Sequence, residues 1–123
     1  MKGILVTSNN QIEVKDFDEP LHKSLGAAVG GYIEIVHPMG LAEPGIMIVN
    51  DEGLIHNLPV NALGCLLYGT HIHGSPILGN IVIMKTGWTA NGMDIIGLND
   101  QEAQELYQTL LPHVEAFRDA EIS

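Results

Sequence analysis

The residues best suited to chemistry are two histidines, His71 and His73, in the segment THIHGSP. In an extended backbone both side chains would point the same way, and two imidazoles can begin a zinc site. His56, Cys65 or Asp94 could complete the ligand set, but no spacing in the chain brings them together. We therefore expect no metal and no other cofactor. Contact with a ligand or a second subunit, or a polar loop over the core, remain the other interpretations of the pair.

Glu34 is the one acid in the alternating strand pattern YIEIVH, and a buried carboxyl of this kind can act as a general base. No nucleophile pairs with it in the sequence. An exposed edge position, or an ion pair with Lys2 or Lys85, is the interpretation we favour. No serine lies in a nucleophile-elbow motif, and neither a phosphate loop nor a dinucleotide fingerprint is present. The chain is therefore expected to bind rather than to catalyse.

The segment from Gly53 to Met84 contains no Asp, Glu, Lys or Arg, in a chain that carries 15 acids and 5 bases. Burying charge is costly, so this composition suits a core wall, a subunit interface or an uncharged ligand pocket. Tryptophan in the glycine-flanked loop GWTANG adds an aromatic face that a ligand could stack on. The ligand-binding residues predicted from these features are Asn61, Tyr68, Thr70, His71, His73, Ser75 and Trp88.

Net charge and composition restrict the partners. The formal net charge is −10, and the five bases are scattered, so direct nucleic-acid binding through a basic patch is not expected. With 46% hydrophobic and only 16% charged residues, the chain has little polar cover, and we expect a homo-oligomer. No signal peptide or membrane span is recognisable, which predicts a cytoplasmic protein.

Periodicity divides the chain into strands and helices. The expected strands cover residues 2–7, 11–15, 32–37, 46–49, 54–56, 77–85 and 93–96. The expected helices cover residues 18–29, 61–68 and 99–121, with Asp18, Asn61 and Asn99 as N-caps. Glu102 completes a capping box with Asn99, and Pro112 should kink or divide the last helix. Tyr32 is expected to pack in the core.

This order of elements predicts an α+β fold: a small, mostly antiparallel twisted sheet or partial barrel with two short helices and a C-terminal helix. We expect a single domain over residues 1–123, with a sheet-rich core at 1–98 and the C-terminal helix at 99–121.

Three segments follow one another along the chain and together form a recognisable pattern: GGYIEIV at 30–36, IVNDEGLIHNLPVNALGCLLYG at 48–69, and ILGNIVIM at 77–84. In this the chain resembles a family of small proteins of phages, plasmids and other mobile elements, known only as a domain of unknown function. The resemblance covers about residues 1–100. It implies a mobile-element origin and brings no reaction, cofactor or catalytic set.

Three hypotheses follow. The first is a non-enzymatic, anti-defence binding protein that sequesters a small, nucleotide-derived ligand. The second is an acidic protein–protein inhibitor of a host nucleic-acid-handling defence enzyme. The third is a metal-dependent hydrolase centred on His71 and His73. No association with a membrane is expected under any of them.

Overall fold

The computed structural model describes residues 1–122, except for the side chains of His73 and Ile122. Within that range one antiparallel sheet runs in the order β2-β1-β5-β4-β3, and β6 pairs with β5 outside this path. The strands are β1 (Lys2–Val6), β2 (Ile12–Asp16), β3 (Ile33–Val36), β4 (Gly45–Asn50), β5 (Ile81–Thr89) and β6 (Gly92–Ile96). The helices are α1 (Leu21–Val29), α2 (Ala62–Tyr68), α3 (Thr70–His73) and α4 (Asp100–Ile122). The predicted α+β class, with its antiparallel sheet and C-terminal helix, is confirmed.

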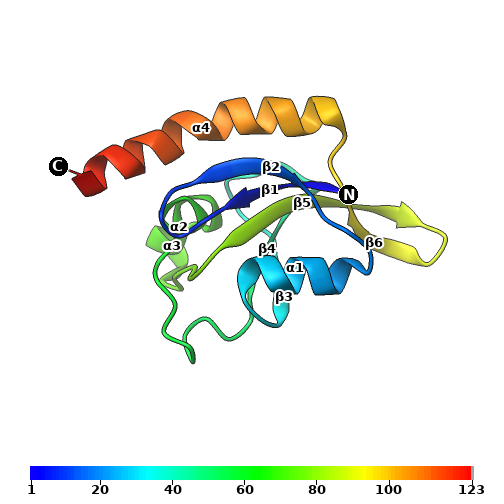
Figure 1. The fold of residues 1–123 in the computed structure, drawn as a ribbon, viewed down its shortest axis with the longest axis horizontal. Helices are drawn as coiled ribbons and strands as arrows, with labels where there is room; N and C mark the ends of the chain where they lie inside the picture. The colour runs from blue at the N-terminus through cyan, green and yellow to red at the C-terminus, as the bar shows by residue number, and fades with distance from the viewer. Residues whose placement is uncertain (123) are drawn as a thin grey trace.

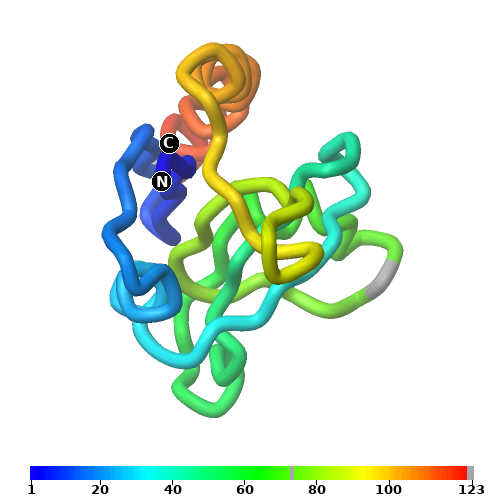
Figure 2. Tube along the Cα trace, turned by 90° about the vertical axis from the view of Figure 1, so that its right-hand side faces the viewer, coloured from blue at the N-terminus to red at the C-terminus, as the bar shows by residue number. Residues whose placement is uncertain are grey.

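The two faces of the sheet bury different halves of each central strand, because successive side chains point to opposite faces. On the face that α2 and α4 cover, Ile81 and Ile83 of β5 join one apolar cluster with Leu63 and Val114. On the other face, Val82 and Met84 join a second cluster with residues of α1, including Leu25. Figure 1 shows α4 above the strands and α1 below them, and Figure 2 shows the same separation from the side. The sheet is therefore the middle layer of three: α2 and α4 cover one face, and the short helix α1 covers part of the other.

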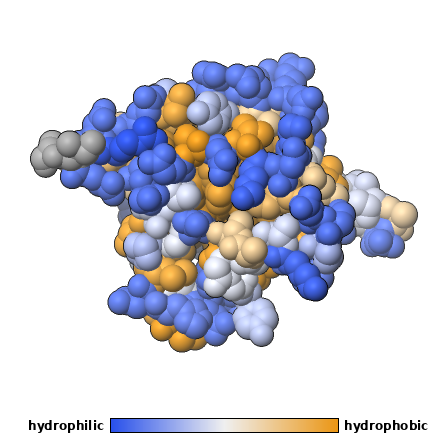
Figure 3. Space-filling view, in the orientation of Figure 1, coloured by the Kyte–Doolittle hydropathy of each residue, from blue (hydrophilic) through white to orange (hydrophobic). Residues whose placement is uncertain are grey.

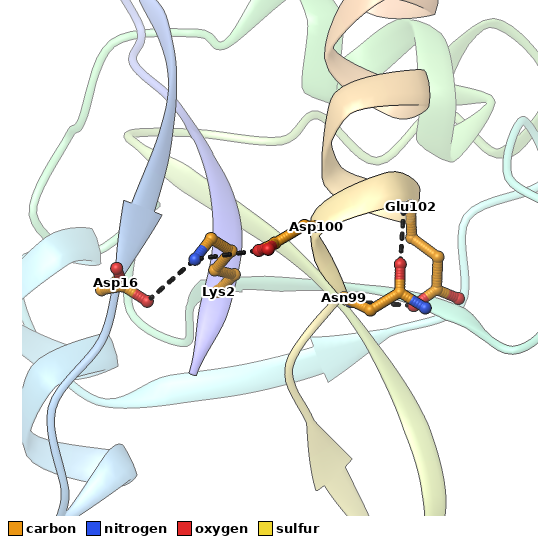
Figure 4. Close-up of polar contacts among 5 residues, drawn as sticks. All are labelled: Lys2, Asp16, Asn99, Asp100 and Glu102. Atoms are coloured by element: carbon orange, nitrogen blue, oxygen red, sulfur yellow. Dashed lines mark hydrogen bonds and ion pairs between the residues drawn. The ribbon is translucent and has the colours of Figure 1, made fainter.

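The start of α4 is tied down by the predicted capping box. The Asn99 side chain accepts a hydrogen bond from the Glu102 N–H (2.7 Å), and the Glu102 carboxylate accepts one from the Asn99 N–H (2.9 Å). Lys2 of β1 lies between Asp16 (3.9 Å) and Asp100 (3.1 Å), which links the helix to the sheet edge (Figure 4). Pro112 does not divide α4, which runs unbroken through it and bends along its length (Figure 1).

Three local predictions were wrong. Residues 54–56 form a turn rather than a strand, because the chain reverses between residues 51 and 57 with Asn57 at positive φ. Asp18 does not cap α1. The helix begins at Leu21, whose N–H donates a hydrogen bond to the Glu19 carboxylate. Tyr32 is 76% exposed rather than packed in the core, since it lies just before the edge strand β3.

No helix in the described part of the chain is long and apolar enough to span a bilayer.

Candidate functional site

A cavity of about 420 Å³ lies beside the edge of the sheet and is here called the β3–β4 cleft. One wall consists of β3 and the end of β4, a second is the turn that follows β4, and the third is the segment that leads into β5. Its volume lies within the range of small-molecule sites. The lining residues are Glu34, Val36, Val49, Asn50, Asp51, Glu52, Gly53, Leu54, Ile55, Tyr68, Ser75, Pro76, Ile77 and Leu78.

Strand register places Glu34 at the cleft. Glu34 pairs with Val49 across β3 and β4, and Val49 belongs to the apolar cluster beneath α2 and α4, so Glu34 lies on that face of the sheet. The turn after β4 brings Asp51 to the same place, because its N–H bonds to the Tyr32 carbonyl (2.8 Å). The Glu34 position at an exposed edge is as expected, but its neighbour is an acid rather than Lys2 or Lys85.

Asn50 builds the corner that holds these carboxylates. Its side chain is buried, donates to the Val29 carbonyl at the end of α1 (3.0 Å) and accepts from the Glu52 N–H (2.7 Å). Next along the chain, Gly53 packs closely on the 75–78 segment: a Cβ there would lie 3.1 Å from the Leu78 Cβ. The corner therefore has little freedom to open or shift, and the acids are held in position by buried contacts.

Burial raises the pKa of Glu34, and a hydrogen bond to Asp51 together with the negative charge of Asp51 raises it further. A negative charge beside a carboxyl group disfavours its ionised form, which is why Asp51 acts on Glu34 in this direction. A titratable pair with a perturbed pKa in a concave site is a frequent mark of a functional site in proteins.

The opposite wall supplies apolar surface and two hydroxyl-bearing residues that the sequence had indicated, Tyr68 and Ser75. Tyr68 ends α2, and Ser75 follows α3 in an exposed position. The Thr70 hydroxyl donates to the Ser75 carbonyl (2.9 Å), which fixes the backbone of this segment. Thr70 therefore supports the wall of the cleft from behind, through Ser75.

Asn61 is completely buried and occupies the centre of a three-way junction. Its amide donates to the Val6 carbonyl of β1 (3.0 Å) and the Gly79 carbonyl (2.9 Å), while its oxygen accepts from the Gly64 N–H (2.9 Å). The predicted N-cap of α2 is confirmed. These bonds engage both polar atoms of the side chain, so Asn61 acts on the cleft by positioning α2.

The other predicted site residues, the histidine pair and Trp88, belong to other parts of the fold. Residues 70–73 form the short helix α3, so His71 and His73 do not alternate along an extended backbone as expected. His71 is exposed, and the side chain of His73 lies outside the described part of the structure. Among the described residues no group of three or more His, Cys, Asp or Glu is placed to hold a metal ion. Trp88 was predicted to lie in a loop, but it belongs to β5, where it is 80% exposed and pairs with Met93 on the opposite face of the sheet from the cleft.

Sequence reasoning missed Asp51 and Glu52 as cleft residues and expected a ligand region free of charge. The signal was present, since NDEG immediately precedes the uncharged segment. Because the chain reverses at this turn, the charged residues just before the uncharged segment line the same cleft as that segment.

Fold and site together define a three-layer α+β protein with an acid-lined cleft at one sheet edge. The chain matches the family described as Domain of unknown function (DUF3846) over residues 1–111, and it belongs to that family. The match includes the whole sheet, every residue of the cleft and the first half of α4. Neither a curated protein nor a solved structure gives a match.

Proposed function

We propose that the protein binds a small, nucleotide-derived ligand in the β3–β4 cleft and releases it unchanged. The observation that carries the proposal is the Glu34–Asp51 carboxyl pair, which lies in a cavity of about 420 Å³ whose other walls are largely apolar. Apolar walls with a few convergent polar groups are the usual composition of a ligand site. Sequestration of a host signal by such a protein would serve an anti-defence role on a phage or plasmid.

The charge of the cleft determines how such a ligand would lie. Carboxylates accept hydrogen bonds from the amino groups of nucleobases, and Glu34 and Asp51 both line the cleft. The base would stack against the apolar wall at Leu54 and Pro76, with its polar edge toward Glu34 and Asp51. Phosphates would face solvent, because three acids line the cleft and like charges repel.

Equilibrium dialysis against a panel of nucleosides and cyclic nucleotides tests the proposal, with mass spectrometry of the ligand recovered on heating. We expect saturable binding that falls about tenfold or more in the double variant Glu34→Gln/Asp51→Asn. The matched control is Glu115→Gln/Asp119→Asn, which removes the same charge from exposed positions on α4. Equal loss in both double variants would refute a role for the cleft, and a chemically altered ligand would refute non-catalytic binding.

A second candidate is the acidic protein–protein inhibitor, and the surface of α4 favours it. Glu115, Asp119 and Glu121 are exposed on the half of the helix beyond Pro112. Figure 3 shows hydrophilic side chains along the outer side of α4 and apolar ones gathered between the helix and the strands. Loss of binding to a basic enzyme on neutralising these three acids, with ligand binding in the cleft unaffected, would support this candidate.

A further inference from the structure

The hairpin of β5 and β6 carries apolar side chains on the α1 face of the sheet, and two of them, Trp88 and Met93, are exposed. Trp88 pairs directly with Met93, and Thr86 pairs with Ile95, so all four side chains share one face of the sheet, the face of α1. Ile95 is half-buried against the α1 cluster, whereas Trp88 is 80% and Met93 55% exposed. Figures 1 and 3 show the hairpin projecting at the right, beyond the body of the molecule. We call Trp88, Met93 and Ile95 the hairpin face.

The hairpin is built to hold this face rigid. The Thr89 hydroxyl donates to the Gly92 carbonyl (3.0 Å) and accepts from the Asn91 N–H (3.1 Å), which closes the turn, and Gly92 takes the positive φ that the turn requires. On the reverse side, Ile96 packs directly on Gly87, where a Cβ would lie only 2.4 Å from the Ile96 Cδ1. An exposed tryptophan on a fixed backbone loses little entropy when a partner covers it.

Beside the hairpin face lies a separate hollow of about 310 Å³, between β6 and the start of α1. Glu19 and Asp94 are among its lining residues, and Leu21 and Ile95 contribute apolar wall. None of the described residues that line the hollow is Lys or Arg, and the Met1 ammonium there donates to the Phe17 carbonyl (3.0 Å). The hollow thus combines room for an aliphatic stem with acids at its rim.

We infer that the hairpin face and this hollow bind an arginine-bearing segment of a basic protein. Tryptophan is the aromatic residue that attracts a guanidinium most strongly, and the planar group can stack on its face. Glu19 and Asp94 each accept one backbone hydrogen bond, from the Leu21 and Ile95 N–H groups, and their second carboxylate oxygens would accept from a second basic side chain whose stem fills the hollow. The net charge of −10 attracts a basic partner. This surface faces away from the β3–β4 cleft and is independent of what the cleft binds.

The protein itself supplies the probe, because Trp88 is its only tryptophan. A peptide of alternating arginine and glycine is titrated against the full chain while Trp88 fluorescence is recorded, with a citrulline-for-arginine peptide of equal length as the uncharged control. We expect a saturable change with the arginine peptide and none with the citrulline peptide. Equal responses to both would overturn the inference.

Variants place the contact, with binding measured by anisotropy of the labelled arginine peptide. Trp88→Ala should weaken affinity about tenfold, while Tyr32→Ala, which removes another exposed aromatic, should leave it unchanged. Circular dichroism should show unaltered folding of both. Unchanged affinity in Trp88→Ala, or equal loss in Tyr32→Ala, contradicts the assignment. A shift in Trp88 fluorescence that grows with protein concentration alone would assign the face to a second copy of the chain. A fluorescence shift on adding phosphatidylcholine vesicles would assign it to a membrane. Either result overturns the inference.

Discussion

Replacing Asn61 with alanine should be among the most destabilising single changes outside the apolar core. The substitution removes the N-cap of α2, which is worth about 1 kcal/mol. It also strips the Val6 and Gly79 carbonyls of their buried donor, at about 1–3 kcal/mol each. We therefore expect a loss of about 3–7 kcal/mol in the free energy of unfolding, a large share of the stability of a typical domain.

Urea denaturation followed by circular dichroism measures this loss. The matched comparison is Asn99→Ala, because Asn99 caps α4 from an exposed position and should cost only about 1 kcal/mol. Asn61→Ser, which keeps a capping oxygen without the two donors, should fall between them. If Asn61→Ala costs no more than Asn99→Ala, the buried bonds contribute nothing measurable and the reasoning fails.

Three further predictions concern packing and charge. Gly64→Ala should destabilise by about 1–3 kcal/mol despite its helical position, because the new Cβ would lie 2.7 Å from the Ile77 Cγ2; an unchanged urea midpoint would show that Ile77 moves freely. Bonds from the Asn99 N–H and from Lys85 lower the pKa of Glu102, so the stabilisation is present above the ordinary pKa of 4.5 and is lost as pH falls through the lowered value. The stability difference between wild type and Glu102→Gln should therefore shrink on acidification, and a constant difference would contradict it. Glu34 has the opposite sign: its raised pKa makes the wild type lose stability as pH rises above 4.5, so Glu34→Gln should gain on the wild type toward neutral pH, and a relative loss there would refute the shift.

The elements with local signals could be predicted from the sequence. The Asn99–Glu102 capping box lies within one turn of helix, and the β-branched apolar runs in β1 and at the start of β5 are buried, as such runs predict. The N-cap at Asn61 is also local. Its two donor bonds are not, since Gly79 and Val6 lie far away along the chain. The same residue was therefore predicted correctly as a cap and could not be recognised as a junction.

The cleft could not be predicted because it forms from segments that are distant in sequence. Leu54 and Ile55 look like a strand, yet in the turn they form a cleft wall and are largely exposed. The spacing of His71 and His73 fits a strand or a loop, and the better signal was the flanking glycines: Gly69 and Gly74 both adopt positive φ and bound the helical turn of α3. Glu34 was singled out correctly as unusual, but its partner Asp51 depends on where the turn after β4 folds.

The most direct test of the central claim is an amide ¹H–¹⁵N NMR titration of the full chain with the nucleosides and cyclic nucleotides of the dialysis panel. Binding in the β3–β4 cleft predicts saturable shifts at Glu34, at residues 51–54 and at Ser75, Ile77 and Leu78, with α4 and the β5–β6 hairpin unaffected. Shifts confined to α4 or to the hairpin, or no shifts with any ligand of the panel, would contradict the account.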